Sequence, residues 1–560
     1  MTLFDETKQD KKLEEMRERE AEDLAQLLSS RYSLPYIDLT KVSINSDALK
    51  LVPEELARRA GIALFHVKGK FVDAAVITPR NEELNSIFAD LRDKHYQVAL
   101  FIASEASLGR AWDRYKELSS ATKTQAGLID ISAEELSNFL AAIKNLEDLK
   151  REVTTTIESS KSHGISKLLE LILAGAVATD SSDIHLEPEE TEARLRFRLD
   201  GVLQDIGILK KEAYNLLLSR IKLISSLKLN IKGAAQDGRF TIRVGENDVE
   251  VRTSVTPGSY GEGVVLRVLD PKAIAISFEE LGIATRLRTL VDIEIKKPNG
   301  MVLVTGPTGS GKTTTLYAFL KKINLPGSKI ITIEDPIEYH LKGISQTQVS
   351  DEKGYTFVEG LRAALRQDPD ILMIGEIRDN ETAKVAVDSS LTGHLVFSTL
   401  HTNNAGGAIP RLVDLGANPK VLSSALHLAL AQRLVRKLCK VCKQQAVPTD
   451  TERKTIDQIL ATVRDKEPES IPGEIVLWKA VGCEACNGTG FKGRLGVFEG
   501  VKMTEAIETV ITTSVSERDI MRAAAPQKML TMAEDGIIKV LTGVTTLDEL
   551  DRVVDLEIAS

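Results

Sequence analysis

From about residue 281 onward, apolar runs alternate along the chain with helical patterns. Four of these runs are almost continuously apolar and have the length of strands: 301–305, 329–333, 371–374 and 395–399. Continuous apolar strands are typical of a parallel sheet that is covered by helices on both faces. The pattern therefore predicts an α/β core over residues 281–435.

Two further units are predicted before this core. Short apolar runs alternate with helical patterns over residues 25–120, which indicates a small α/β domain. The Ser/Thr-rich and charged stretch 121–164 is interpreted as a linker. Residues 165–272 begin with a helical run and continue with strand patterns, and strict alternation over 193–199 places three arginines on one face of a strand. This second unit is expected to be α+β.

Length and composition limit the class of protein. A chain of 560 residues is too long for one core and is expected to form three or four domains. Residues 1–24 form a charged leader, which excludes a secretory signal peptide. The longest apolar stretch, 168–178, contains Glu170 and is too short to span a bilayer. We therefore expect a cytoplasmic protein that reaches a membrane only through a partner.

The net charge is −9, which argues mildly against nucleic acid as the main ligand. A local basic groove inside an acidic chain remains the alternative.

A glycine-rich loop follows the first strand of the predicted core. It fits the phosphate-loop pattern of two glycines five apart followed by Lys-Thr. Backbone N–H groups of such a loop surround phosphate oxygens, and the helix that follows points its positive end at the same anion. Lys312 would reach the β- and γ-phosphates, and the Thr313 hydroxyl would hold Mg²⁺. The expected nucleotide-binding residues are Gly306, Pro307, Thr308, Gly309, Ser310, Gly311, Lys312, Thr313 and Thr314.

Acidic residues follow two other strands of the predicted sheet. Asp335 and Glu338 lie just past the strand at 329–333, and Glu376 follows the strand at 371–374. The carboxyl ends of parallel strands face the ligand crevice, so these carboxylates are candidates to orient or deprotonate an attacking water. The alternatives are a solvated turn around a proline and a surface acid after a buried strand.

Two histidines bracket the strand at 395–400. His394 precedes it and His401 follows it. A histidine after a strand can report the γ-phosphate to a neighbour through a hydrogen bond, whereas a purely structural histidine is the alternative.

Four arginines are candidates to stabilise phosphoryl charge as arginine fingers. Arg252 and Arg267 belong to the second unit, and Arg362 and Arg366 lie four apart on a predicted helix. The alternative for each is a surface ion pair.

The chain has four cysteines in two Cys-x-x-Cys pairs: Cys439, Cys442, Cys483 and Cys486. Four thiolates at this spacing suit a tetrahedral structural Zn²⁺, because a cytoplasmic chain has little use for disulfides. Redox pairs and unused thiols are the alternatives. We expect a zinc-binding segment over 436–500 and helices over 501–560.

These features together resemble the secretion ATPases, in particular the GspE/PilB branch, the motors of type II secretion and type IV pilus assembly. The phosphate loop, the acidic box at 334–338, Glu376 and the histidine box at 392–402 occur in the order found in that family. The resemblance covers residues 165–560 strongly and 25–120 more weakly. It implies a RecA-like core, a preceding PAS-like α+β domain and a tetracysteine zinc subdomain.

The resemblance also implies roles for residues. Glu338 matches the proposed general base, Glu376 the glutamate beside the metal, and His394 and His401 the histidine box. The four candidate arginines match residues that the family uses at the nucleotide, some of them across a subunit interface. It further implies Mg²⁺-dependent ATP hydrolysis by a homohexamer that drives an inner-membrane platform protein and extrudes pilin-like subunits.

One feature departs from many pilus-assembly members. Before Leu24 there is only a charged leader, and the family's cyclic-di-GMP motif is missing. We therefore expect no control by cyclic-di-GMP, and the choice between pilus assembly and secretion stays open. The rival interpretation is a nucleic-acid translocase built on the same core.

Overall fold

The structure, a computed structural model, divides into two compact units, Met1–Asp130 and Ile131–Ser560. No helix in its described part is long and apolar enough to cross a membrane. The described residues are 20–39, 41–42, 44–49, 51–81, 83–122, 128–131, 145–159, 165–244, 247–269, 276–350 and 353–556.

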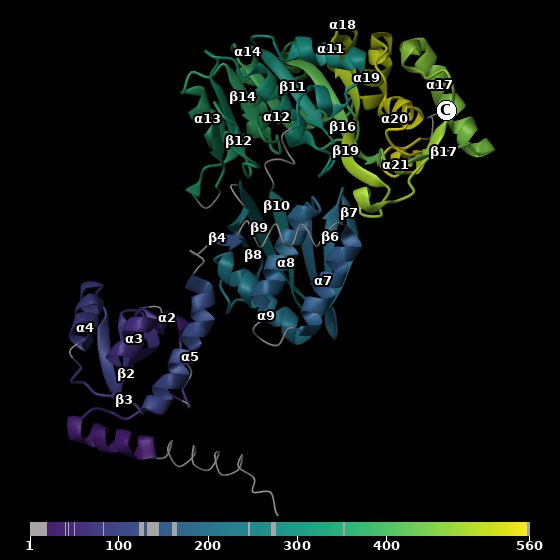
Figure 1. The fold of residues 1–560 in the computed structure, drawn as a ribbon. Coiled ribbons are helices and arrows are strands. Elements are labelled where there is room, and N and C mark those ends of the chain that lie inside the picture. The colour runs from purple at the N-terminus through teal and green to yellow at the C-terminus, as the bar shows by residue number, and fades with distance from the viewer. Residues whose placement is uncertain are drawn as a thin grey trace, which may run out of the picture. The chain divides into compact units, whose positions relative to one another are not determined.

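The first unit is a small α/β domain around a three-stranded sheet of order β1-β2-β3 (Figure 1). β1 and β2 pair antiparallel, and β2 and β3 pair parallel because α4 crosses over between them. The Trp112 indole N–H donates to the Ile62 carbonyl at 2.9 Å, which ties α5 to β1. The elements are a helix over 20–32, α2 (Ser46–Leu49), α3 (Glu54–Ala60), β1 (Ile62–Lys68), β2 (Phe71–Val76), α4 (Glu83–Asp93), β3 (Gln97–Ile102) and α5 (Glu105–Thr122).

The second unit begins with an α+β domain, as the alternation of its sequence predicts. Its strands pair antiparallel in the order β8-β9-β10-β5-β6-β7. Apolar residues of the strands and of α7, α8 and α9 are buried, whereas the arginines of β6 alternate with buried positions. The elements are α7 (Leu146–Ser159), α8 (Ile165–Ala178), β5 (Asp183–Pro188), β6 (Glu192–Leu199), β7 (Val202–Lys210), α9 (Lys211–Ile224), β8 (Gln236–Val244), β9 (Asn247–Gly258) and β10 (Gly261–Leu269). The short strand β4 (Leu128–Ile131) spans the boundary between the two units.

The prediction of a linker over residues 121–164 does not hold for residues 146–159, which form a helix. α7 lies there, and its Leu149 and Val153 side chains are fully buried. A Cβ added to Gly175 of α8 would lie 2.5 Å from the Leu149 side chain, so the two helices approach closely at this glycine. α7 therefore belongs to the α+β domain.

The core of the second unit is a seven-stranded sheet of order β13-β12-β14-β15-β11-β16-β19. All neighbours pair parallel except β16 and β19, which pair antiparallel. Every residue of β11, β12, β14 and β15 is buried, as expected for strands covered on both faces. The strands are β11 (Gly300–Thr305), β12 (Ile330–Glu334), β13 (Ser345–Gln348), β14 (Ile371–Ile374), β15 (Leu395–Leu400), β16 (Leu426–Leu438) and β19 (Phe491–Lys502).

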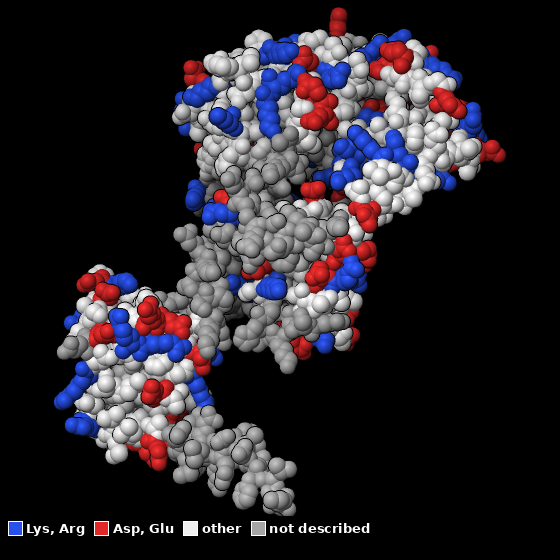
Figure 2. All heavy atoms as spheres, viewed as in Figure 1, with Lys and Arg blue, Asp and Glu red and all other residues white. Residues whose placement is uncertain are grey.

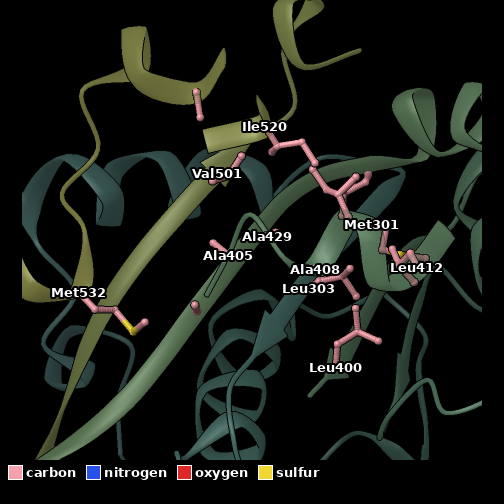
Figure 3. Packing of buried hydrophobic residues seen from close by; sticks show 14 of the residues in the cluster. Met301, Leu303, Leu400, Ala405, Ala408, Leu412, Ala429, Val501, Ile520 and Met532 are labelled. Atoms are coloured by element: carbon pink, nitrogen blue, oxygen red, sulfur yellow. The ribbon is translucent and has the colours of Figure 1, made fainter. Parts of the chain in front are cut away.

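Successive residues of each strand enter different apolar cores. Met301 and Leu303 join one cluster and Val302 and Val304 the other, because side chains alternate between the faces of a strand. The second cluster also holds apolar residues of α11 and α12, and the first holds those of α13 and α14. Figure 3 shows part of the first cluster, with Met301 and Leu303 of β11 among its labelled residues. These helices are α11 (Thr285–Glu294), α12 (Lys312–Ile323), α13 (Phe357–Leu365) and α14 (Asn380–Leu391). The α/β core with a parallel sheet, which the apolar runs predict, is confirmed.

The C-terminal part shares this core, so the boundaries expected at 435/436 and 500/501 do not separate compact bodies. β19 extends the sheet, and Ile456, Ile520 and Val540 join the same cluster as Met301. The remaining elements are η1 (Glu279–Leu281), α15 (Ala408–Asp414), α16 (Pro419–Ala425), β17 (Gln444–Ala446), α17 (Asp450–Lys466), η3 (Pro468–Ser470), β18 (Leu477–Lys479), η4 (Glu484–Cys486), α18 (Glu505–Thr513), α19 (Glu517–Ala524), η5 (Ala525–Gln527), α20 (Met532–Leu541) and α21 (Leu547–Asp551).

Candidate nucleotide site

The glycine-rich loop joins the end of β11 to α12, which begins at Lys312. Gly306 and Gly311 have φ angles of +148° and +88°, a region that side chains other than glycine rarely adopt. A Cβ at Gly306 would lie only 2.5 Å from the Gln432 carbonyl oxygen of β16. These two glycines therefore fix a loop whose backbone lies directly against the neighbouring strand.

Lys312 is placed to meet an anion at this loop. Its Nζ donates to the carbonyl oxygens of Gly306 at 2.8 Å and Pro307 at 3.1 Å, so it folds back over the loop. Burial lowers the pKa of Lys312; the carboxylate of Glu376 acts in the opposite direction and the guanidinium of Arg433 in the same direction. Glu376 and Arg433 thus lie close enough for their charges to act on the ammonium group.

Two hydroxyl groups of the loop suit a hard cation. The Ser310 Oγ is buried without a hydrogen-bond partner among the described residues. Thr313 is half-buried in the first turn of α12, one residue after Lys312. Hydroxyl oxygens are ligands that Mg²⁺ accepts, so this part of the loop fits the expected metal. Pro307, Thr308 and Gly309 form the exposed tip of the loop.

The end of β12 carries a buried carboxylate that the sequence analysis did not single out. Glu334 accepts hydrogen bonds from the Tyr317 and Thr332 hydroxyls and from the Gln346 amide at 3.1 Å. Burial raises the pKa of Glu334, and these three hydrogen bonds oppose the shift. Because all its partners belong to the core, Glu334 fixes the segment that leads to Glu338.

Glu338 is held by an arginine of the α+β domain. The Arg252 Nη1 lies 3.3 Å from the Glu338 Oε2, and its Nη2 donates to the Ile337 carbonyl. The structure therefore brings together two residues that the sequence separates by 86 positions, and it does so within one chain.

Glu376 follows β14 and is mostly buried, with 13% of its side chain exposed. Its carboxylate pairs with Arg378, and its Oε2 lies 3.4 Å from the His401 Nε2. Asp379 caps the N-terminus of α14 by accepting from the Thr382 N–H at 2.8 Å, which fixes the backbone just beyond the pair. The structure thus unites Glu376 and His401 at neighbouring strand ends.

Within one chain, His394 is not brought to this site, and its role in the histidine box stays a prediction. It precedes β15, whereas His401 follows it, so six strand residues, about 20 Å, separate the two. Its Nδ1 lies 3.0 Å from the Ser389 carbonyl oxygen, and its own carbonyl accepts from the Gly300 N–H. His394 therefore lies at the opposite end of β15 from His401, with both of its hydrogen-bond partners in the core.

Charged residues form a row across the sheet of the α+β domain. Register places Arg239, Arg252, Arg267, Asp183 and Arg198 directly opposite one another on five adjacent strands. Asp183 bridges two of them, 3.0 Å from the Arg267 Nε and 3.3 Å from the Arg198 Nε. Like charges in direct opposition destabilise a sheet, so this row is an electrostatic feature that packing alone does not explain.

The two arginines of α13 lie apart from Lys312 and Glu376. Arg362 is exposed and pairs with Glu359 at 3.0 Å and with Glu381 of α14. Arg366 is exposed at the end of α13, and no partner of its side chain occurs among the described residues. Within one chain, the structure joins neither of them to the phosphate loop.

The four cysteines form a separate cluster whose Sγ atoms all lie within 4.8 Å of one another. The Sγ–Sγ distances are 3.8 Å for Cys439–Cys483, 3.8 Å for Cys442–Cys486 and 3.7 Å for Cys483–Cys486. Four sulfurs about 2.3 Å from a central tetrahedral Zn²⁺ would be about 3.8 Å apart. The cluster therefore fits the predicted metal.

Three residues of this region were missed from the sequence: Glu334, Arg378 and Arg433. The signal for Arg433 is the polar pair Gln432-Arg433 inside the otherwise apolar run 428–435 of β16. On the face shown in Figure 2, Lys and Arg side chains gather over β16 and β19.

The fold and this site define a P-loop α/β protein. Comparison with known families identifies the family to which it belongs. The model of the type II/IV secretion system protein family matches residues 158–552, and the MshEN domain model matches residues 32–122. The chain belongs to the type II/IV secretion system protein family.

Individual proteins that are similar to this chain are consistent with this family. Type II secretion system protein E of Pseudomonas aeruginosa is 46% identical over 75% of this chain and 81% of its own length. The type IV pilus assembly ATPase PilB of Thermus thermophilus is 38% identical over 94% of this chain and 57% of its own length. The solved structure of the Yersinia pseudotuberculosis ATPase DotB covers 70% of this chain and 94% of its own, with a TM-score of 0.50 and 19% identity, which supports the fold alone.

Proposed function

We propose that this protein is a Mg²⁺-dependent ATPase that drives the assembly of pilin-like subunits, in type IV pilus assembly or type II secretion. The observation that carries the proposal is the convergence of Lys312, Glu376 and His401 around the end of β11. Relatives named as type II secretion protein E and as PilB support both systems, and neither is favoured by the residues described.

The reaction is attack of water on the γ-phosphorus, which breaks the bond to the β–γ bridging oxygen and releases phosphate and ADP. Catalysis of this kind rests on positioning and on neutralising charge. Lys312 neutralises phosphate oxygens, and Glu338 orients the water and accepts its proton. Bound at Thr313, Mg²⁺ would add a second neutralising charge, with Glu376 beside it.

Arginines from the α+β domain complete this site in the proposal. Arg252 already contacts Glu338, and Arg267 lies beside it in the charged row. A polyphosphate is a ligand that would offset the repulsion within that row. Arg362 and Arg366 are proposed to serve the nucleotide of a neighbouring subunit in a homohexameric ring.

The cysteine cluster is proposed to hold one structural Zn²⁺. Tetrahedral spacing of the four sulfurs supports it, and a closed site with four protein ligands leaves no open position for chemistry. The metal would join the end of β16 to the turn before β19.

The ring is proposed to work at the cytoplasmic face of the inner membrane, bound to a platform protein rather than to lipid. Family membership supports this placement. No nucleic acid is expected as a partner.

The test is phosphate release by the purified full-length chain, with Lys312→Ala and Lys321→Ala compared. Lys321 is an exposed lysine of the same helix and serves as the control. We expect Mg²⁺-dependent release in the wild type and the control and its loss in Lys312→Ala. Release that persists at wild-type rate in Lys312→Ala would contradict the proposal.

The nucleic-acid translocase is tested in the same assay. If DNA raised the rate several-fold in a salt-sensitive way, the translocase would be favoured over the secretion motor. We expect no such stimulation, since the matched family and relatives are secretion and pilus proteins.

A further inference from the structure

Arg433 lies beside the phosphate loop on a strand that the proposed mechanism does not use. β16 runs parallel to β11, and Ala431 of β16 pairs with Thr305, the last residue of β11. Gln432 and Arg433 therefore continue alongside the first residues of the loop. The close approach of the Gln432 carbonyl to Gly306 places this part of β16 in direct contact with the loop.

The neighbours of Arg433 hold this part of β16 in place but do not neutralise the charge of its guanidinium group. Thr315 of α12 donates its hydroxyl to the Gln432 Oε1 at 2.7 Å, which ties the strand to the helix after the loop. The Arg433 Nη2 donates to the Asn403 Oδ1 at 3.3 Å. Its Nη1 is buried and has no hydrogen-bond partner among the described residues. An unpaired buried donor on a cation calls for an anionic acceptor.

The nearby acid does not supply that acceptor. Glu499 of β19 is almost fully buried, and its two carboxylate oxygens accept from the backbone N–H groups of Ala405 at 2.7 Å and Met532 at 3.3 Å. Its charge acts on Arg433 only through space. Glu499 therefore serves the packing of the C-terminal helices and leaves the Arg433 Nη1 without a hydrogen bond.

The order of the strands in the sheet sets the side of the phosphate loop from which each group approaches. Glu338, Glu376 and His401 follow β12, β14 and β15, which all lie on one side of β11, and β16 lies on the other. Arg433 thus comes from the strand on the other side of the loop, and its Nη2 reaches across to Asn403, two residues past His401.

We propose that Arg433 binds the diphosphate that ATP and ADP share, and that it leaves the hydrolysis step itself to the groups that follow β12, β14 and β15. This inference rests on the proposed function, since it assigns a binding residue to the same nucleotide. An interaction made equally with substrate and product raises affinity for both and leaves kcat unchanged.

The test compares Arg433→Ala with Lys437→Ala, an exposed lysine further along the same strand. Calorimetric titration of the full chain with Mg·ADP and the steady-state kinetics of ATP hydrolysis are measured for both. We expect Arg433→Ala to lose about tenfold or more in ADP affinity and to raise KM similarly, with kcat within about twofold. Lys437→Ala should match the wild type.

Two results would overturn the assignment. One is unchanged ADP affinity in Arg433→Ala, and the other is a large fall in kcat at unchanged affinity, which would place Arg433 on the γ-phosphate. Arg433→Lys distinguishes loss of a ligand contact from a defect in folding, because it keeps the positive charge. We expect this variant to recover part of the ADP affinity. If it recovers none, and its melting temperature without nucleotide is also lowered, the role of Arg433 is structural and the assignment is wrong. A wild type that binds ADP but hydrolyses no ATP would contradict the proposed function and leave the assignment of Arg433 standing.

Discussion

At the residue scale, the two candidate catalytic carboxylates are held by different cations. Glu338 is bound by Arg252 of another domain, whereas Glu376 is paired with His401 and Arg378 inside the core. A carboxylate held from outside the core can change its surroundings when domains move, and one held inside cannot. We therefore propose that Glu338, and not Glu376, has a role that depends on movement of the domains.

The first prediction concerns these two acids. Glu338→Gln and Glu376→Gln keep the shape of the side chain but remove its charge, so ATP affinity should stay within several-fold while hydrolysis slows by about a hundredfold or more. Binding by calorimetry and phosphate release measure the two effects. Asp388→Asn, at an exposed acid on α14, is the control. Near wild-type turnover in Glu338→Gln would remove its role as general base.

A second prediction separates the two histidines. His401→Ala removes the partner of Glu376, so turnover should fall at least tenfold. His394→Ala removes only a bond to the Ser389 carbonyl at the far end of β15, so kcat should stay within about twofold and the melting temperature should drop. Equal losses of kcat in both variants would contradict the separation of roles.

At the element scale, the cysteine cluster links two segments that are distant in sequence. Each cysteine pair adjoins an end of the antiparallel strands β16 and β19, and Cys439 N–H donates to the Gly490 carbonyl at 2.9 Å. Metal binding at such a junction stabilises folding locally rather than at the phosphate loop.

The third prediction is therefore one zinc per chain. Cys442→Ser should lower the zinc content and destabilise this segment while Mg·ADP binding persists, because the loop belongs to the buried β11–α12 unit. Elemental analysis and calorimetry measure the two quantities. Protein purified without chelator that contains no zinc would contradict the prediction.

The central strands could be predicted because burial on both faces makes them continuously apolar, as in β11 and β15. α7 could not, since its apolar positions Leu146, Leu149 and Val153 lie among charged residues and are buried in a helix that packs against α8 and β7. The extent of the core was missed for a similar reason: β19 completes the sheet from residues that follow the cysteine segment. The local pattern of apolar and polar residues does not indicate which distant strands will pair.

Prediction of the candidate site from sequence is limited in the same way. The phosphate loop, Glu376 and His401 could be found because each follows an apolar strand, and their meeting follows from parallel strand order. The pairing of Arg252 with Glu338 joins two domains, so no local pattern could predict it. The catalytic roles of all these residues stay predictions.

At the scale of the whole molecule, the charged row of the α+β domain is the feature for which we propose a contact with a neighbouring subunit. Arg252 finds Glu338 in its own chain, whereas Arg267 is held by Asp183 and has a largely exposed side chain. An exposed arginine beside a nucleotide site can act across a subunit interface, which is how arginine fingers supply charge in trans. A ring would then be required for activity.

The most direct test of this account is complementation between inactive variants. Lys312→Ala and Arg267→Ala are each measured alone and then mixed, and phosphate release is followed as total protein rises. We expect little activity from either variant, recovery of part of the wild-type rate on mixing, and specific activity that rises steeply with concentration, because a mixed interface pairs an intact loop with an intact arginine. Mixing Lys312→Ala with Glu338→Gln, two defects of the same core, should give no recovery. Specific activity that stays constant down to nanomolar protein, with no rescue in the first mixture, would contradict both the arginine in trans and the active ring.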